Sequence, residues 1–121
     1  MLDDDGFVLW ESHAIMQYLA DKTPGQTLYP TGLRERSDVN RWLRCAAHLM
    51  REHGGVLDAH LATRQWICGD ALTLADFSIA APLADSARAK LPVEGLNHIQ
   101  RWFAGVRAQE AWKATEPQAP R

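Results

Sequence analysis

The hydrophobic positions of this chain recur with a helical period through most of its length. Apolar residues fall three and four positions apart in four stretches, about 12–21, 33–52, 56–65 and 97–111. That spacing places side chains on one face of an α-helix. A fifth stretch, 77–84, is apolar on nearly every side, which is typical of a helix through the centre of a core. The pattern therefore predicts about five helices.

A short β-hairpin is predicted before the first helix. Asp4-Asp5-Gly6 is a turn signal, because glycine adopts positive φ freely and aspartate tolerates it. The β-forming residues Phe7–Trp10 come next as a strand. Only Met1–Asp3 precede the turn, so we expect a very short partner strand.

Several helix ends carry recognisable capping signals. Ser12 is a suitable N-cap for the first helix. Thr73 and Asp76 form a short version of the capping box, with Leu72 and Phe77 placed as its hydrophobic staple. We interpret Thr73 and Asp76 as structural residues that start a helix, and not as catalytic ones.

Breaks in the helical pattern are set by proline and glycine. Thr23-Pro24-Gly25 ends the first helix and leads into a linker. Gly54-Gly55 predicts a break or weak point between the second and third helices. Pro82 predicts a kink in the fourth, because proline removes the hydrogen bond to the Ser78 carbonyl.

Composition narrows the class of protein. Hydrophobic residues make up 46% of the 121 residues and charged residues 23%, as in soluble globular domains. A net charge of −2 argues against nucleic acid as a partner. No apolar run reaches the roughly 20 residues of a membrane span, and the acidic start is unlike a signal peptide. We therefore expect a cytoplasmic protein with no membrane partner.

Candidate metal and redox chemistry is sparse. Cys45 and Cys68 lie in apolar surroundings, so we expect both to be buried, reduced thiols without a disulfide or zinc set. The five histidines show no metal-ligand spacing, and Asp3-Asp4-Asp5 fits a solvated turn. No metal site is predicted.

Two segments together resemble the glutathione S-transferase family, in the style of bacterial theta- and delta-like members. Residues 7–19, Phe-Val-Leu-Trp-Glu-Ser-His-Ala-Ile-Met-Gln-Tyr-Leu, resemble the last strand and third helix of that family's thioredoxin-like domain. Residues 69–78, Gly-Asp-Ala-Leu-Thr-Leu-Ala-Asp-Phe-Ser, resemble the capping-box segment of its all-helical domain. The resemblance implies a mainly α protein: a remnant hairpin and helix over 1–30, and a C-terminal-like helical bundle over 31–121.

The resemblance also implies a ligand site. In the family, a Glu-Ser pair holds the γ-glutamyl end of glutathione, and here that pair is Glu11 and Ser12. A carboxylate at Glu11 suits the ammonium group of the ligand. The hydroxyl and amide of Ser12, at a helix N-terminus, suit its α-carboxylate.

The chain departs from the family pattern in two places. The front of the thioredoxin-like domain, which carries the residue that activates the thiol, is absent from this sequence, so no catalytic residue is assigned. A helical hairpin of the family is missing near Gly54-Gly55. We expect partial glutathione binding, little or no conjugating activity, and a homodimer or higher oligomer. A non-enzymatic self-association or interaction module is the alternative, and a shortened product without a role of its own is a third.

Overall fold

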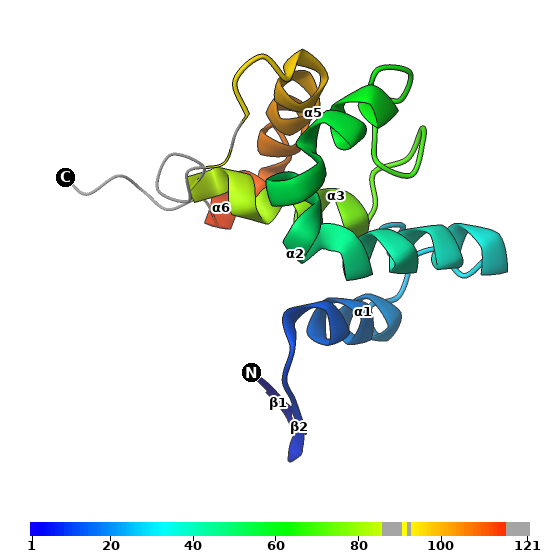
Figure 1. The fold of residues 1–121 in the computed structure, drawn as a ribbon. Helices are drawn as coiled ribbons and strands as arrows, with labels where there is room; N and C mark the ends of the chain where they lie inside the picture. Colours follow the sequence, from blue (N-terminus) through cyan, green and yellow to red (C-terminus); the bar gives the residue numbers. More distant parts are fainter. Residues whose placement is uncertain (86–90, 92, 116–121) are drawn as a thin grey trace.

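The computed structural model describes residues 1–85, 91 and 93–115, and for 46–51 and 85 it gives the backbone only. A two-stranded sheet comes first, and helices make up most of the remaining chain (Figure 1). This mainly α architecture after an N-terminal hairpin confirms the predicted fold class. In chain order the elements are β1 (Leu2–Asp4), β2 (Phe7–Leu9), α1 (Ser12–Lys22), α2 (Leu33–Leu61), α3 (Leu74–Ala80), the 3₁₀ helix η1 (Ala81–Asp85), α5 (Asn97–Arg107) and α6 (Glu110–Thr115).

The hairpin is antiparallel and its turn is built as the sequence predicts. Leu2 lies opposite Leu9. The first strand is Leu2–Asp4, one residue later than the expected Met1–Asp3. Asp5 and Gly6 both have positive φ, 51° and 91°, as a two-residue type I′ hairpin turn requires. In Figure 1 the hairpin extends away from the helices, below α1.

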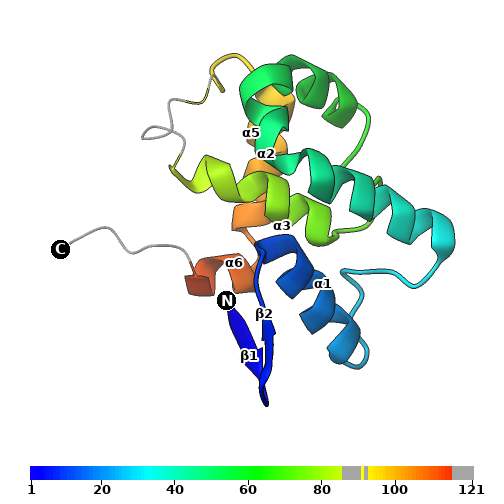
Figure 2. The same ribbon diagram turned by 60° about the horizontal axis from the view of Figure 1, so that its bottom comes forward.

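Helix α3 lies at the centre of the helical body. It packs against α2, α5 and α1, and Figure 2 shows it between them. Ala75, Ile79 and Ala80 are fully buried. The α-helix ends at Ala80, and the chain continues as η1 with Pro82 inside it. The kink predicted at Pro82 therefore takes the form of a change from α to 3₁₀ geometry.

The break predicted at Gly54-Gly55 is a kink within one long helix. His53 leaves helical geometry, with φ of −135° and ψ of 31°, and two helical arms meet there. The second arm ends at Leu61 and not at the expected Gln65. The fully or almost fully buried side chains described on the two arms are Val39, Leu43, Leu57 and Leu61.

The last predicted helix, 97–111, is two helices. Helix α5 stops at Arg107 and α6 starts at Glu110, so the single-helix prediction is wrong. The interruption redirects the chain so that Trp112 reaches the core, where it is 9% exposed. Its ring meets Phe103 edge to face, with 5.8 Å between centroids. Burial of this large aromatic side chain favours the bent path over a straight helix.

Helices α2 and α5 cap each other's ends. Asp58 on α2 accepts hydrogen bonds from the amides of His98 and Ile99, both at 2.9 Å. Arg101 on α5 donates to the Leu61 carbonyl, the last residue of α2, at 2.6 Å. Unpaired groups at helix ends are thus satisfied by side chains about 40 residues away.

The two cysteines differ in burial. Cys68 is half-buried, and burial raises the pKa of its thiol to about 11. Cys45 is exposed, so the expectation of two buried thiols is wrong for it. Cys45 comes two residues after the buried Leu43, which turns it to the opposite face of α2. Among the described residues, no helix has the length and apolar character needed to cross a membrane.

Candidate ligand site at the start of the first helix

Glu11 occupies a strained position between β2 and α1. Its φ of 79° and ψ of 120° place a non-glycine residue in a region that such residues rarely adopt. The carboxylate folds back onto the helix and accepts hydrogen bonds from the amides of His13, at 3.1 Å, and Ala14, at 2.9 Å. Glu11 is therefore the N-cap of α1. The prediction of Ser12 as N-cap is wrong, because Ser12 is already the first helical residue.

Ser12 keeps its polar groups largely free. Its side chain is exposed, and its hydroxyl makes only a long contact, 3.4 Å, to Glu11 Oε1. The amides of His13, Ala14 and Ile15 all donate to Glu11. Within the described part of the chain, the Ser12 amide has no such acceptor. One amide and one hydroxyl at the helix start are thus open to an anion.

The Glu11 carboxylate is held in its charged form. Hydrogen bonds from the amides of Ala14 and His13 lower the pKa of Glu11 below its ordinary value. Each carboxylate oxygen has a second lone pair, and the side chain is 48% exposed. A cation can therefore approach Glu11 without displacing the cap. The adjacent cation-accepting and anion-accepting groups suit a zwitterionic amino-acid head group.

His13 connects this segment to the buried helix α3. Its Nε2 lies 2.6 Å from Oγ of Ser78, and its Nδ1 lies 3.6 Å from Oε1 of Glu11. Ser78 is 8% exposed. The sequence predicts no role for His13, because nothing local connects positions 65 residues apart.

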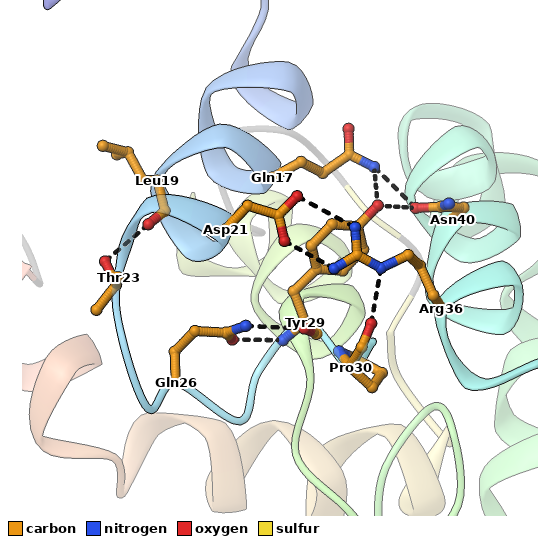
Figure 3. A network of polar contacts seen from close by, with 9 residues as sticks. All are labelled: Gln17, Leu19, Asp21, Thr23, Gln26, Tyr29, Pro30, Arg36 and Asn40. Carbon is orange, nitrogen blue, oxygen red and sulfur yellow. Dashed lines mark hydrogen bonds and ion pairs between the residues drawn. The ribbon is translucent and has the colours of Figure 1, made fainter. Parts of the chain in front are cut away.

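The middle and end of α1 are fastened to the helical body by a polar network (Figure 3). The Tyr29 hydroxyl donates to Asn40 Oδ1 on α2 at 2.8 Å, and Gln17 on α1 donates to both, at 3.1 and 2.8 Å. Arg36 on α2 binds both carboxylate oxygens of Asp21, at 2.7 and 3.1 Å. Helix α1 is therefore held to α2 at its centre and its C-terminal end.

The Arg36 side chain also organises the linker. Its Nε donates to the Pro30 carbonyl at 2.7 Å, and its guanidinium lies 3.9 Å from the ring centroid of Tyr29. Hydrogen bonding to Arg36 lowers the pKa of Asp21. One arginine thus joins α1, the linker and α2 in a bidentate and stacked geometry that lysine does not reproduce.

The hairpin is attached to α1 mainly through Asp4. The Tyr18 hydroxyl donates to Asp4 Oδ2 at 2.6 Å, and Lys22 forms an ion pair with the same carboxylate. The hydrogen bond from Lys22, together with the weaker effect of that from Tyr18, lowers the pKa of Asp4. Phe7 packs on the Tyr18 ring, with 5.5 Å between centroids. The hairpin and the residue after it keep apolar side chains exposed: Phe7 and Val8 are each 52% exposed and Trp10 is 75% exposed.

Thr73 and Asp76 lie inside the helical body. Both halves of the capping box are present, with the Thr73 amide donating to Asp76 Oδ2 at 2.9 Å. The fully buried carboxylate also accepts from the Ile67 amide, at 2.9 Å, and from Trp102 Nε1, at 2.8 Å. Burial raises the pKa of Asp76 against the lowering effect of these bonds. The residue joins three segments and is closed to ligands.

One hollow of the structure lies away from Glu11 and Ser12. It measures about 720 Å³ and lies between the start of α2 and the Cys68 loop, with Arg34, Asp38 and Arg41 in its lining. A smaller apolar hollow of about 320 Å³ lies beside α1, next to Met16 and Leu19. Glu11 and Ser12 line neither of these hollows, and both residues are exposed. Among the described residues, no cluster of three or more His, Cys, Asp or Glu side chains is placed to hold a metal ion.

Comparisons with known proteins match this arrangement. The family model "Glutathione S-transferase, C-terminal domain" matches residues 46–110. Glutathione S-transferase GstA of Escherichia coli O157:H7 is 32% identical, over 94% of this chain and 71% of the relative. That alignment runs over 143 residues, more than the 121 of this chain, so the relative carries residues without a counterpart here.

Two further comparisons differ in kind. The theta-class glutathione S-transferase of Xanthomonas axonopodis pv. citri, solved with glutathione bound, is 26% identical with a TM-score of 0.77, over 96% of this chain and 70% of that one. The bifunctional glutamate/proline–tRNA ligase of Cricetulus griseus is 30% identical over 88% of this chain. This chain spans only 8% of that ligase.

Proposed function

This chain belongs to the glutathione S-transferase family, and on that premise we propose that it binds glutathione through Glu11 and Ser12. The proposal rests chiefly on the strained backbone of Glu11, with φ of 79°. Strained residues of this kind gather at ligand sites, where the surrounding structure enforces them. Here the strain holds a charged, half-exposed carboxylate beside an open amide and hydroxyl.

The recognition we propose is that of the γ-glutamyl head of glutathione. Its ammonium group pairs with the Glu11 carboxylate. Its α-carboxylate accepts hydrogen bonds from the amide and hydroxyl of Ser12. The solved relative with glutathione bound supports this choice among zwitterionic ligands.

For these 121 residues by themselves, we propose little or no conjugation of glutathione to electrophiles. A thiol nucleophile needs a neighbouring group that stabilises the thiolate. We assign no such group in this sequence. We propose that residues 1–30 belong to a thioredoxin-like domain and that a helical hairpin of the family is missing at the His53 kink. The 143-residue alignment with GstA supports that loss.

Calorimetric titration with glutathione tests the binding. We expect millimolar affinity for the unaltered chain, with a clear loss in Glu11→Gln and in Ser12→Ala. Asp5→Asn is a matched control that alters an exposed acid in the hairpin turn. Absence of heat at tens of millimolar glutathione, with the protein folded by circular dichroism, would rule out the proposal. A standard conjugation assay with an aromatic electrophile should give little or no turnover.

A second candidate is a non-enzymatic interaction module in the cytoplasm, which forms homodimers or binds another protein. The match to a segment of a tRNA ligase supports it, because the name of that protein describes ligation and not glutathione transfer. The exposed side chains of Phe7, Val8 and Trp10 offer apolar surface for contact. Sedimentation over a wide concentration range tests self-association, and a monomer at every concentration would count against it.

A further inference from the structure

The geometry points to His13 as a positioning residue, which transmits the packing of α3 to the proposed ligand site at Glu11 and Ser12. This inference rests on the proposed glutathione binding. Its basis is a chain of contacts from the buried Ser78 through His13 to Glu11. The two ring nitrogens of His13 face different partners: Nε2 faces Ser78 and Nδ1 faces Glu11. The imidazole ring therefore acts as a rigid spacer between these two residues.

Ser78, at one end of this series of contacts, is held in place by the packing of α3. Ser78 lies on α3, two residues after the buried Asp76, whose three hydrogen bonds fix the start of that helix. Its hydroxyl is 2.6 Å from His13 Nε2. Nε2 of His13 forms a hydrogen bond with the Ser78 hydroxyl, and Nδ1 faces Glu11 Oε1 at 3.6 Å, beyond hydrogen-bond distance.

Glu11, at the other end of this series of contacts, has the strained backbone. The conformation of Glu11 is unfavourable for an isolated residue, so neighbouring contacts must maintain it. The Glu11 carboxylate is fixed by the amides of His13 and Ala14, which are backbone groups of the turn that His13 itself ties to α3. Loss of the His13–Ser78 contact therefore frees the first turn of α1 and, with it, the orientation of the Glu11 carboxylate.

Side-chain replacements separate this role from a general loss of packing. Ser78→Ala removes the anchor, and His13→Ala removes the spacer. His13→Gln keeps an amide group near the position of Nε2, which can donate to Ser78 through its nitrogen or accept from it through its oxygen. Ser37→Ala makes the same chemical change at an exposed position of α2 and is the matched control.

Glutathione affinity is the first readout. We expect Ser78→Ala and His13→Ala each to weaken binding about five- to tenfold, and the double variant to be no weaker than either single one. His13→Gln should recover most of the affinity, and Ser37→Ala should leave it unchanged. Equal affinities for the unaltered chain and both alanine variants would overturn the inference and leave the proposed binding in place.

Amide hydrogen exchange is the second readout, and it needs no ligand. We expect the amides of His13 and Ala14 to exchange faster in Ser78→Ala than in the unaltered chain, while the Ile99 amide on α5 stays protected. Unchanged exchange at His13 and Ala14 would overturn the inference. If the unaltered chain does not bind glutathione, the proposed function and the positioning role both fail. Faster amide exchange in Ser78→Ala would then mean that the His13–Ser78 contact has a structural role alone.

Discussion

The helical body and the N-terminal segment are stabilised in different ways. Around α3, buried apolar side chains pack together, and the buried Asp76 carboxylate accepts hydrogen bonds from the Ile67 amide and the Trp102 indole. The hairpin and α1 are held by exposed or half-exposed polar contacts, through Asp4, His13, Gln17 and Asp21. Two half-buried apolar residues of α1, Met16 and Ala20, also pack against the core, and α1 contains no fully buried residue. The helical body is therefore stabilised by its own buried core. The N-terminal segment is held against that body, and its outer surface stays exposed.

Removal of the buried carboxylate is the strongest test of this contrast. Asp76→Ala leaves the Ile67 amide, the Thr73 amide and the Trp102 indole without an acceptor. We expect a loss of about 3 kcal/mol or more in the free energy of unfolding, measured by urea denaturation. The exposed Asp70→Asn should change it by less than about 0.5 kcal/mol. Similar values for the two variants would contradict the central role of Asp76.

The network in Figure 3 should have a smaller effect. Tyr29→Phe removes a hydroxyl that bonds Gln17 and Asn40 within a residue that is 4% exposed. We expect a loss of about 1–2 kcal/mol in the free energy of unfolding. Tyr18→Phe removes a hydroxyl that faces the half-exposed Asp4 and should cost less. The reverse order would mean that the hairpin, and not the network, holds α1 in place.

As the pH falls, the N-terminal segment should lose its structure before the helical body around α3 does. Asp4, Glu11 and Asp21 have lowered pKa values in the folded protein. Their stabilising contribution is full above the ordinary values of about 4 and disappears as the pH falls through the lowered values. Asp76 has a raised pKa, so its protonation relieves a desolvation penalty.

Amide NMR spectra recorded from pH 6 downward test this difference. Below about pH 4 we expect the signals of α1 to lose dispersion while those of α3 keep theirs. Simultaneous loss of both sets would show that the segment and the body unfold as one unit, and the contrast between them would fail.

Thiol labelling gives the smallest effect and probes the surface of the body. With a pKa of about 11, roughly one Cys68 in a thousand is a thiolate at pH 8, and the side chain is half-buried. We expect iodoacetamide to modify Cys45 in the folded protein and Cys68 only after unfolding, as followed by mass spectrometry. Rapid modification of Cys68 under native conditions would contradict the packing of its loop.

Local signals in the sequence were enough for most of the fold. The hairpin turn at Asp5-Gly6, the central helix after Thr73 and the interruption near Gly54-Gly55 all arise from the conformational preferences of a few residues. The break between α5 and α6 has no such local origin, because it depends on where Trp112 finds space in the finished core.

The candidate site shows the same division. Glu11 and Ser12 were identified from a short segment, and their glutathione binding stays a prediction. The capping role of Glu11 was missed, because carboxylate capping from a residue with positive φ leaves no distinct pattern. The contacts of His13 with Ser78 and of Asp58 with α5 join distant positions, and only the folded chain brings them together.

A glutathione titration followed by amide NMR tests the central claim most directly. If the N-terminal segment is a ligand site held on a self-sufficient body, residues 11–14 should shift first and most, and signals of α5 should stay unmoved. Shifts confined to the hollow beside Arg34 and Cys68, or no shift at tens of millimolar glutathione with the protein folded, would contradict it.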